Sequence, residues 1–531
     1  MPGNAPKTSR HLEVERKFDV VESTVTPSFE GIAAVARVQK VPTESLDAIY
    51  FDTPTQDLAR NKITLRRRTG GHDAGWHLKL PAGPDARTEI RAPLGSEPDD
   101  AVPSELLDVV LAIVRDRPVK PVARITTQRE SQVLHGSAGT ALAEFSNDHV
   151  TAWAAGTAEN ADSGPVEQEW REWELELAES DEDADLELLS RLSNRLLDAG
   201  AEPAGHASKL ARVLGTTVPS NGTQLPEDPV LRAVAEQVGE LLVWDRAVRA
   251  DTYDSVHQMR VITRKIRSLL KDAQESLAST DDDAFVWILD ELRELAGVLG
   301  VARDAEVLAQ RYELELDRLP SELVRGPVRE RLVEGAQRRY QTGLRRSLIA
   351  MRSQRYFRLL DALDALVADS PVIASGEEAP TVTIDAAYKK VRKAAKAAVQ
   401  AEKAAQADQA ADTDDTDQID DTDEPHAEEQ DPDDALHQIR KRAKRLRYTA
   451  AATGADEVSK QAKAIQTLLG DHQDSVVSRK HLLQQADAAH AAGEDTFTYG
   501  LLHQQEAELA DNARQQLDAA LRKLDKSVRN A

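Results

Sequence analysis

The octapeptide HLEVERKF, residues 11–18, carries charged side chains at alternating positions. Glu13, Glu15 and Lys17 are two residues apart, so in a β-strand all three side chains lie on one face of the sheet. If that face is solvated, the charges need no special explanation. If it is enclosed, two carboxylates and an ammonium group predict a bound metal ion together with an anion.

Other segments show the same alternation, with acids and bases in separate groups and apolar residues on the opposite face. These charged faces carry Arg66 and Arg68; Lys79; Arg87, Glu89 and Arg91; Glu144 and Asp148; and Glu172, Glu174 and Glu176. Simple cross-strand ion pairs are one interpretation. A wide barrel with a charged lumen, whose apolar outer face is covered by helices, explains the whole pattern better. His72 and His77 are interpreted as surface or rim residues rather than ligands.

The elements that would position these side chains form a β-rich region between residues 10 and 178. Eight candidate strands span residues 11–20, 46–51, 62–68, 76–80, 88–92, 122–134, 141–151 and 167–178. Turn signals such as Thr69-Gly70-Gly71 separate several of them. Two short helices are predicted near residues 104–115 and 185–200. Eight strands in one unit predict a closed antiparallel barrel, which leaves no exposed edge.

The composition sets the broad class of protein. A chain of 531 residues predicts two or more domains. It has no cysteine, no apolar run long enough for a membrane span and no signal-peptide core, so we expect a cytoplasmic protein. The net charge of −25 argues against a nucleic-acid partner. Bases nevertheless cluster locally, which predicts a compact polyanionic ligand.

The Glu13-x-Glu15-x-Lys17 motif resembles the ExExK signature of the CYTH family, the triphosphate tunnel metalloenzymes. That family includes class IV adenylate cyclases, thiamine triphosphatases and inorganic triphosphatases. The resemblance covers residues 9–214. It also rests on YFDTP (50–54), ITLRRR (63–68), WHLKLP (76–81), TEIR (88–91), the acidic strand near residue 174 and Ser208-Lys209.

The resemblance implies roles for the charged residues. Arg66, Arg68, Lys79, Arg91, Arg129 and Lys209 would hold the phosphates of a triphosphate. Glu13, Glu15, Glu172, Glu174 and Glu176 are the candidates to bind Mg²⁺ or Mn²⁺, although which of the last three bind metal stays open. Lys17 would lie beside the terminal phosphate and, with Glu13 and Glu15, take part in catalysis. Arg124 and Arg129 differ in strand parity, and Arg129 is preferred for the lumen.

After a polar linker at residues 215–228, the pattern changes to helical periodicity, and a helical domain is predicted over residues 229–527. An internal repeat lies within it. Val256-His257-Gln258-Met259-Arg260 recurs as Leu436-His437-Gln438-Ile439-Arg440. Each copy is followed by a Leu-Gly-x-x-x-Asp segment, ending at Asp304 or Asp474, that is predicted to be a turn between helices.

Each copy of the repeat carries a basic stripe at helical spacing. The two stripes are His257, Arg260, Arg264 and Arg267, and His437, Arg440, Lys444 and Arg447. A solvated helix face is the plain interpretation of one such stripe, but two matched copies favour a binding role. The arrangement resembles a CHAD domain, which implies two pseudo-symmetric four-helix units whose stripes line one groove. The family is associated with inorganic polyphosphate.

Between the two copies, residues 402–434 are rich in Asp, and most of this acidic insertion is predicted to be disordered, although a helix over about 382–407 extends into its start. Its plain interpretation is a solubilising loop, and a sharper hypothesis is a polyanion mimic that competes for the basic groove. The predicted fold is therefore α+β and multidomain: an eight-stranded barrel over 9–214, then an all-α domain.

Three functions are compatible with this organisation. The first is hydrolysis of inorganic triphosphate, or of polyphosphate ends, coupled to polyphosphate binding by the helical domain. The second is a non-catalytic polyphosphate-binding protein associated with granules. The third and weakest is a class IV adenylate cyclase, because no nucleotide pocket is evident in the sequence. We expect no membrane partner, and the oligomeric state is left open.

Overall fold

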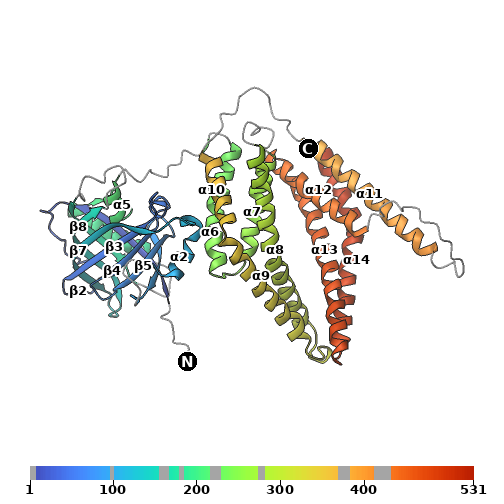
Figure 1. Cartoon of the computed structure of the whole chain (residues 1–531), viewed down its shortest axis with the longest axis horizontal. Coiled ribbons are helices and arrows are strands. Elements are labelled where there is room, and N and C mark those ends of the chain that lie inside the picture. Colours follow the sequence, from blue (N-terminus) through green and yellow to red (C-terminus); the bar gives the residue numbers. More distant parts are fainter. Residues whose placement is uncertain are drawn as a thin grey trace, which may run out of the picture. The chain divides into compact units, whose positions relative to one another are not determined.

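The computed structural model describes residues 8–95, 101–154, 167–178, 185–215, 226, 229–272, 282–368, 383–411 and 432–531. The chain forms two compact units. The first contains residues 1–299 and 345–372, and the second contains residues 300–344 and 373–531. The strands belong to the N-terminal part of the first unit, and helices make up the remainder of the described chain (Figure 1).

Eight antiparallel strands form a closed barrel, which confirms the predicted fold class. They are β1 (Ser9–Val20), β3 (Glu44–Asp52), β4 (Thr64–Thr69), β5 (Gly75–Pro81), β6 (Ala86–Ala92), β7 (Lys120–His135), β8 (Ala141–Ala154) and β9 (Glu167–Leu177). Their order is β1-β6-β5-β4-β3-β7-β8-β9, and β1 pairs with β9 to close the ring. The short strands β2 (Arg37–Lys40) and β10 (Glu202–Pro203) pair with β7 and β1 and were not predicted.

The apolar outer face of the barrel is covered by helices, as the charge pattern predicted. Helix α4 (Leu186–Asp198) packs against the outside of β1, β8 and β9, where Phe145 and Trp173 are fully buried. The N-cap of the helix is Asp185, whose carboxylate accepts a hydrogen bond of 2.8 Å from the Leu188 amide. Leu188, Leu192 and their neighbours form its buried stripe because they recur at helical spacing.

Three short helices cover the outside of β3 to β6. They are α1 (Asp57–Arg60), α2 (Ser104–Val109) and α3 (Leu111–Val114). Leu106 and Ile113 pack there against Phe51, Leu65 and Leu78. The sequence predicted a single helix over residues 104–115, whereas the chain breaks it at Val110.

Helix α5 (Lys209–Leu214) lies inside the barrel rather than outside it. Leu210 and Val213 pack against Ile125, Val150 and Ala152, which point into the lumen. The N-terminus of α5 is capped by Ser208, whose hydroxyl accepts a hydrogen bond of 3.1 Å from the Ala211 amide. This helix therefore fills one end of the barrel with apolar side chains.

The helical part of the first unit begins with α6 (Pro229–Arg249) and α7 (Ser255–Asp272), which pack against each other. Helix α10 (Gln354–Ala368) packs on α6. The boundaries between the two units fall at residues 299/300 and 344/345, within the residue ranges of α8 (Asp282–Arg318) and α9 (Gly335–Met351).

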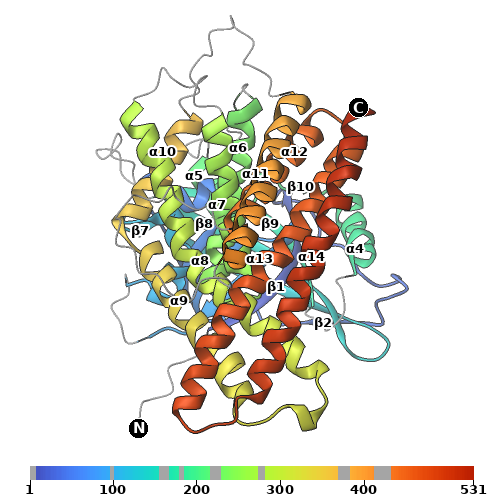
Figure 2. The same cartoon turned by 90° about the vertical axis from the view of Figure 1, so that its right-hand side faces the viewer.

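In the second unit, α11 (Ile384–Ala411), α12 (Pro432–Ala452), α13 (Asp456–Ala491) and α14 (Phe497–Arg529) lie side by side (Figure 2). Ile439, Leu446 and Ile465 are in their shared core. A second core joins Tyr312 and Leu316 of α8 to Leu502 of α14.

The two Leu-Gly-x-x-x-Asp segments are not turns, so that prediction was wrong. Both lie in the interior of long helices, because α8 runs for 37 residues and α13 for 36 without a break. Glycine weakens a helix by only about 1 kcal/mol, which tertiary packing overrides easily. Gly470 has a packing role instead, because a β-carbon there would be 3.4 Å from a guanidinium nitrogen of Arg440.

The predicted acidic insertion is described only in part. Helix α11 extends to Ala411 and α12 begins at Pro432, so both ends of the predicted insertion are helical. A helix was predicted to end near residue 407, and α11 continues four residues beyond it. Residues 412–431 lie outside the described residues, and the hypothesis about their role remains a prediction. Within the described chain, no helix has the length and apolar character needed to cross a membrane.

Candidate functional site

A cavity of about 820 Å³, including its open mouth, occupies the lumen of the barrel. The inward-facing positions of seven strands and the start of α5 line it. Every residue predicted to bind triphosphate or to act in catalysis is among them: Glu13, Glu15, Lys17, Arg66, Arg68, Lys79, Arg91, Arg129 and Lys209. The sequence period of two therefore brings these side chains together, since alternate residues of each strand point into the lumen.

The three charged residues of β1 are tied to neighbouring strands. Lys17 Nζ lies 2.5 Å from Glu15 Oε2 and 2.9 Å from Glu174 Oε1. Lys79 Nζ lies 2.5 Å from Glu13 Oε2. Burial alone would lower the pKa of Lys17, but Glu15 and Glu174 raise it above its ordinary value. Lys17 therefore stays protonated and can neutralise an anion, but it cannot serve as a base.

The surroundings of Glu176 and Glu13 favour the protonated form of each carboxyl group. Burial raises the pKa of Glu176 to about 7; Lys79 opposes the rise, while Glu13 and Glu15 add to it. Burial likewise raises the pKa of Glu13 against the effect of Lys79. Carboxylates that are hard to ionise when alone become favourable ligands of a divalent cation, which supplies the missing positive charge. Glu13 and Glu176 thus fit a role as ligands of Mg²⁺ or Mn²⁺. Glu15 differs from them, because burial would raise its pKa but Lys17 and Lys79 lower it to about 2.

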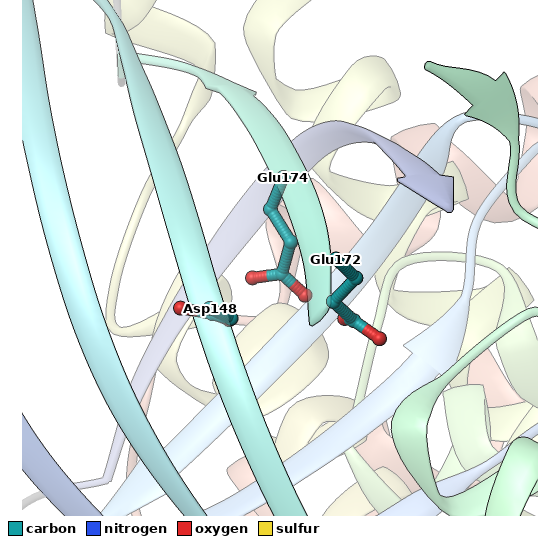
Figure 3. Close-up of side chains that lie close together, drawn as sticks. All are labelled: Asp148, Glu172 and Glu174. Atoms are coloured by element: carbon teal, nitrogen blue, oxygen red, sulfur yellow. The ribbon is translucent and has the colours of Figure 1, made fainter. Parts of the chain in front are cut away.

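A second acidic group consists of Asp148, Glu172 and Glu174, with one oxygen of each lying within 4.8 Å of the others (Figure 3). These carboxylates already have cationic partners. Arg129 binds Asp148 through two hydrogen bonds of 2.8 and 2.6 Å, and it also contacts Glu174. Lys209 Nζ lies 2.9 Å from Asp148, 2.6 Å from Glu172 and 2.7 Å from Glu174.

The predicted metal ligands therefore differ in whether cationic side chains already contact them. Glu172 faces Lys209 on one side and accepts a hydrogen bond of 2.6 Å from the Trp170 indole on the other. A metal ion between Asp148 and Glu172 would have to displace the Lys209 ammonium group. The sequence could not rank Glu172, Glu174 and Glu176. Glu172 and Glu174 contact the Lys209 ammonium group, whereas burial raises the pKa of Glu176, and the choice of metal ligands among them stays a prediction.

The arginines of β4 form the cationic side of the lumen. Arg66 donates a hydrogen bond of 3.3 Å to the Tyr50 hydroxyl, and Arg68 pairs with Asp73. Burial, reinforced by Arg66 and Arg129, lowers the pKa of Arg68 to about 9. A guanidinium group crowded by other cations gains most from a polyanion, so this end of the cavity is suited to phosphate oxygens.

The loop between β4 and β5 places Asp73 at the mouth. Gly70 has a positive φ of 77°, and a β-carbon at this position would lie 2.1 Å from the Ser45 carbonyl oxygen. Only glycine fits so close to another backbone.

Sequence reasoning missed part of the lining. Arg87 and Glu89 were left between a structural and a functional role, and both line the cavity, as do Tyr50 and Asp73. The position of His77 was predicted wrongly. It is 1% exposed, and its ring nitrogens lie 2.9 Å from a Glu89 oxygen and 2.9 Å from the Asp73 carbonyl. His77 shares its strand parity with Lys79, which was the available signal for an inward position.

The choice between Arg124 and Arg129 is decided by register. The ladder between β3 and β7 runs without a shift from Glu44–Arg129 to Tyr50–Ala123. Arg129 therefore faces the lumen, whereas Arg124 is exposed on the outside and pairs with Asp47 at 2.5 Å.

The basic stripe of α7 is partly engaged with α8. Arg260 Nε donates to the Ala296 carbonyl oxygen at 3.3 Å, and Arg267 Nε donates to the Leu289 carbonyl oxygen at 3.0 Å. His257 is half-buried, and Arg264 is exposed. These contacts orient two guanidinium groups without neutralising them.

The matching stripe of α12 is partly engaged with α13. Arg447 donates a hydrogen bond of 3.2 Å to Gln466, and Arg440 lies against Gly470. Lys444 and Arg447 both lie over the Tyr448 ring, 5.9 and 5.4 Å from its centre. Burial, aided by Lys441 and Arg440, lowers the pKa of His437. The prediction that both stripes line one groove stays a prediction.

Comparison with known proteins identifies both parts of the chain. Residues 11–208 match the family model of the CYTH domain, and residues 232–483 match that of the CHAD domain. The chain is 70% identical, over the full length of both sequences, to uncharacterized proteins of two Mycobacterium tuberculosis strains, CDC 1551 and H37Rv. A closed barrel with a charged lumen, followed by a helical domain, defines the class. The chain belongs to the proteins that combine a CYTH domain with a CHAD domain.

Solved structures with related folds are more distant. PptA from Streptomyces chartreusis is 20% identical, with a TM-score of 0.41, and the match covers 55% of this chain and 98% of PptA. The CHAD domain of the plant Ricinus communis is 23% identical, with a TM-score of 0.37, and the match covers 55% of this chain and 90% of that domain. At such scores these likenesses carry no argument about function.

Proposed function

We propose that the barrel hydrolyses inorganic triphosphate, or the terminal anhydride of a polyphosphate, with Mg²⁺ or Mn²⁺, and that the helical domain binds polyphosphate. One observation carries the proposal. The enclosed lumen contains a cationic side that suits phosphate oxygens and a separate set of glutamates, Glu13, Glu15 and Glu176, that suits a divalent cation.

In this mechanism the chain's own residues bind, orient and neutralise. Arg66, Arg68 and Arg129 hold phosphate oxygens through guanidinium hydrogen bonds. Lys17, held protonated by its glutamate partners, stabilises the negative charge that grows as the anhydride bond breaks. The oxygen of a water molecule bonds to the attacked phosphorus, and the bridging oxygen leaves with the electron pair of the broken bond. The proton released by the water goes to a phosphate product or to solvent.

The metal ion would be held by Glu13, Glu15 and Glu176, and when bound it supplies charge neutralisation and a more acidic water molecule. Burial of these carboxylates beside Lys17 and Lys79 sets their affinity for the ion, because each lysine offers competing positive charge.

Adenylate cyclase activity is the weaker alternative. Of the described residues that line the cavity, Tyr50 is the aromatic one, and its hydroxyl is engaged by Arg66. An adenine base binds best between apolar or aromatic surfaces. The lining is instead dominated by charged groups, which suits a ligand made of phosphate alone.

One assay separates the three functions. The purified full chain is incubated with triphosphate, ATP or polyphosphate in the presence of Mg²⁺ or Mn²⁺, and phosphate, pyrophosphate and cyclic AMP are measured. Phosphate release from triphosphate that is lost in Glu13→Gln but kept in Arg124→Ala supports the proposal. Tight binding without turnover supports a binding protein. Cyclic AMP formed from ATP supports the cyclase and contradicts the proposal.

The role proposed for the helical domain has its own test. Replacing His257 and His437 together with alanine should weaken polyphosphate binding by the full chain while triphosphate hydrolysis persists. Equal losses of both properties would contradict two separate sites.

A further inference from the structure

Helices α2 and α3, which cover the outside of the barrel, also contact the helical part of the first unit. Leu106 and Ile113 belong to the apolar cluster on the outer faces of β3, β4 and β5, and Leu242 of α6 packs against the same cluster. The barrel and α6 are therefore joined by shared packing as well as by the peptide chain.

Asp108, on α2, links the barrel to two arginines of the helical part. It accepts hydrogen bonds of 2.9 and 3.0 Å from Arg352 and one of 3.2 Å from Arg249. The Arg249 side chain is 2% exposed and also pairs with Asp245 at 2.6 Å. Tyr356 of α10 donates a hydrogen bond of 2.9 Å to Asp245. Hydrogen bonds thus connect α2 continuously with α6 and α10.

Arg115, directly after α3, has a backbone conformation that residues other than glycine rarely adopt. Its φ is 58° and its ψ is −126°, and the Arg117 amide donates a hydrogen bond of 3.1 Å to the Val114 carbonyl oxygen. These are the angles of the first central residue of a type II′ turn, where glycine is preferred. Any other residue is strained there and needs compensation from its surroundings.

The Arg115 side chain supplies that compensation. It is 5% exposed, and its guanidinium group pairs with Asp361 and Asp364, which are three residues apart on α10. Arg117 extends the contact, because it pairs with Asp57 of α1 at 3.1 Å and lies 3.8 Å from Asp361. The turn by itself favours glycine, so the contact with α10 explains why an arginine is present.

The strands that pack against α2 and α3 carry predicted phosphate-binding residues on their other face. Leu65 and Leu78 point outward into the apolar cluster, whereas Arg66 and Lys79, the next residue of each strand, line the cavity. A ligand that fixes these strands from inside therefore also fixes the surface on which α2 and α3 pack.

We infer that α2 and α3 couple the barrel to α6 and α10, and that the pairing of Arg115 with Asp361 and Asp364 is the lock between them. Ligand binding in the lumen then stabilises α6 and α10, and by thermodynamic reciprocity the docked helices strengthen binding in the lumen. The lock itself does not depend on turnover, so the inference goes beyond the proposed function.

Hydrogen–deuterium exchange of the full chain tests the lock without a ligand. Arg115→Gly gives the turn its preferred residue but removes the ion pairs, so exchange in α10 should become about 10-fold faster. The double variant Asp361→Asn with Asp364→Asn alters α10 instead, and exchange should become faster in α2 and α3. Arg124→Ala, an exposed position on the barrel, is the control and should change neither region. An effect confined to the substituted element in either variant would overturn the inference.

Excess inorganic triphosphate with Mg²⁺ then tests transmission from the lumen. In the wild-type chain we expect slower exchange in the strands and in α6 and α10, and in Arg115→Gly slower exchange in the strands alone. Arg66→Ala should abolish both effects by weakening binding in the lumen. Protection confined to the strands of the wild-type chain would overturn the coupling and leave the proposed function standing. If triphosphate protects no strand, the proposed function fails, and the ligand-free comparison alone decides whether the lock exists.

Discussion

The barrel and the helical domain both contain clusters of basic side chains, but these side chains differ in their partners and in their exposure. In the barrel, Arg129 and Lys209 are enclosed and each contacts two or more carboxylates of the lumen. On α7 and α12, Arg260, Arg267 and Arg447 bond to neutral oxygens and stay partly accessible. Enclosed charges must be balanced by protein groups before any ligand arrives, whereas an accessible stripe is balanced by solvent ions.

The contrast teaches that the two regions suit different events. The barrel holds opposite charges in fixed positions inside a confined space, which suits selective binding of a short phosphate group and chemistry on it. A basic stripe at helical spacing suits a long polyanion, with strength that depends on salt. The predictions below test this division, starting with the largest expected effect.

Removing the guanidinium group of Arg129 should have the largest effect on folding. Arg129→Ala leaves Asp148 and Glu174 in the lumen with less positive charge, and uncompensated buried charges cost about 3–5 kcal/mol. We expect a fall of that size in the free energy of unfolding by urea at neutral pH. Arg447→Ala on α12 is the matched change and should cost under about 1 kcal/mol. Equal losses would erase the distinction between enclosed and accessible charges.

Replacing Lys17 should mainly reduce turnover, whereas replacing Arg129 should mainly reduce stability. Lys17→Met removes an ammonium group from the site where charge develops, so kcat for triphosphate should fall about 100- to 1,000-fold. Steady-state kinetics with saturating Mg²⁺ measures it. Because Lys17 stays protonated, the wild-type pH profile should show no loss of activity caused by its deprotonation below about pH 10. A rise in KM alone would contradict a role in the transition state.

Glu176 predicts a pH effect on the metal-free protein. Its pKa rises from 4.5 to about 7 on folding, so between these values the folded state binds more protons than the unfolded state. Stability should therefore fall as pH increases from about 4.5 to 7, by up to about 3 kcal/mol at 1.4 kcal/mol per unit. Thermal unfolding in EDTA measures this, and Glu176→Gln should flatten the curve.

Adding a divalent cation should oppose the loss of stability that Glu176 causes as the pH rises. Binding requires the ionised carboxylate, so Mg²⁺ or Mn²⁺ should restore stability most strongly near neutral pH. If wild type and Glu176→Gln respond equally to the cation, Glu176 is not among its ligands.

The smallest effect is expected on the helical stripes. Arg260→Ala should weaken polyphosphate binding by the full chain only about 3- to 10-fold at low salt, because one accessible charge among several is lost. The difference should shrink as salt screens the remaining charges. Titration at two salt concentrations measures it, with Lys441→Ala, an exposed residue of α12 outside the stripe, as the control. A salt-independent loss would indicate that Arg260 acts through helix packing.

Much of the barrel could be predicted because strand periodicity is written locally in the sequence. The eight predicted strands overlap the eight strands of the closed barrel, and their charged faces line the lumen. The repeat of His257 and His437 in α7 and α12 was likewise visible, because helical spacing needs only a few turns of sequence.

The errors lie where distant residues decide the outcome. The Leu-Gly segments were taken as turns, since glycine often ends helices, yet packing carries α8 and α13 straight through them. His77 was placed at the rim, although Glu89 and the Asp73 carbonyl hold it in the interior. These contacts could not be predicted from the residues that neighbour each segment in the sequence.

The sequence by itself determined which side chains would face a common lumen, because the alternation of a strand is a property of the backbone. Only the tertiary structure decided which of those charges balance one another. Lys209, brought in by α5, neutralises Glu172, while Glu176 lies with Glu13 and Glu15. Only the tertiary structure, too, places α5 against the inner face of the barrel, because this packing joins a helix to strands that are distant in the sequence. Electrostatic balance and packing depend on distances in space, and those distances are set when the barrel closes.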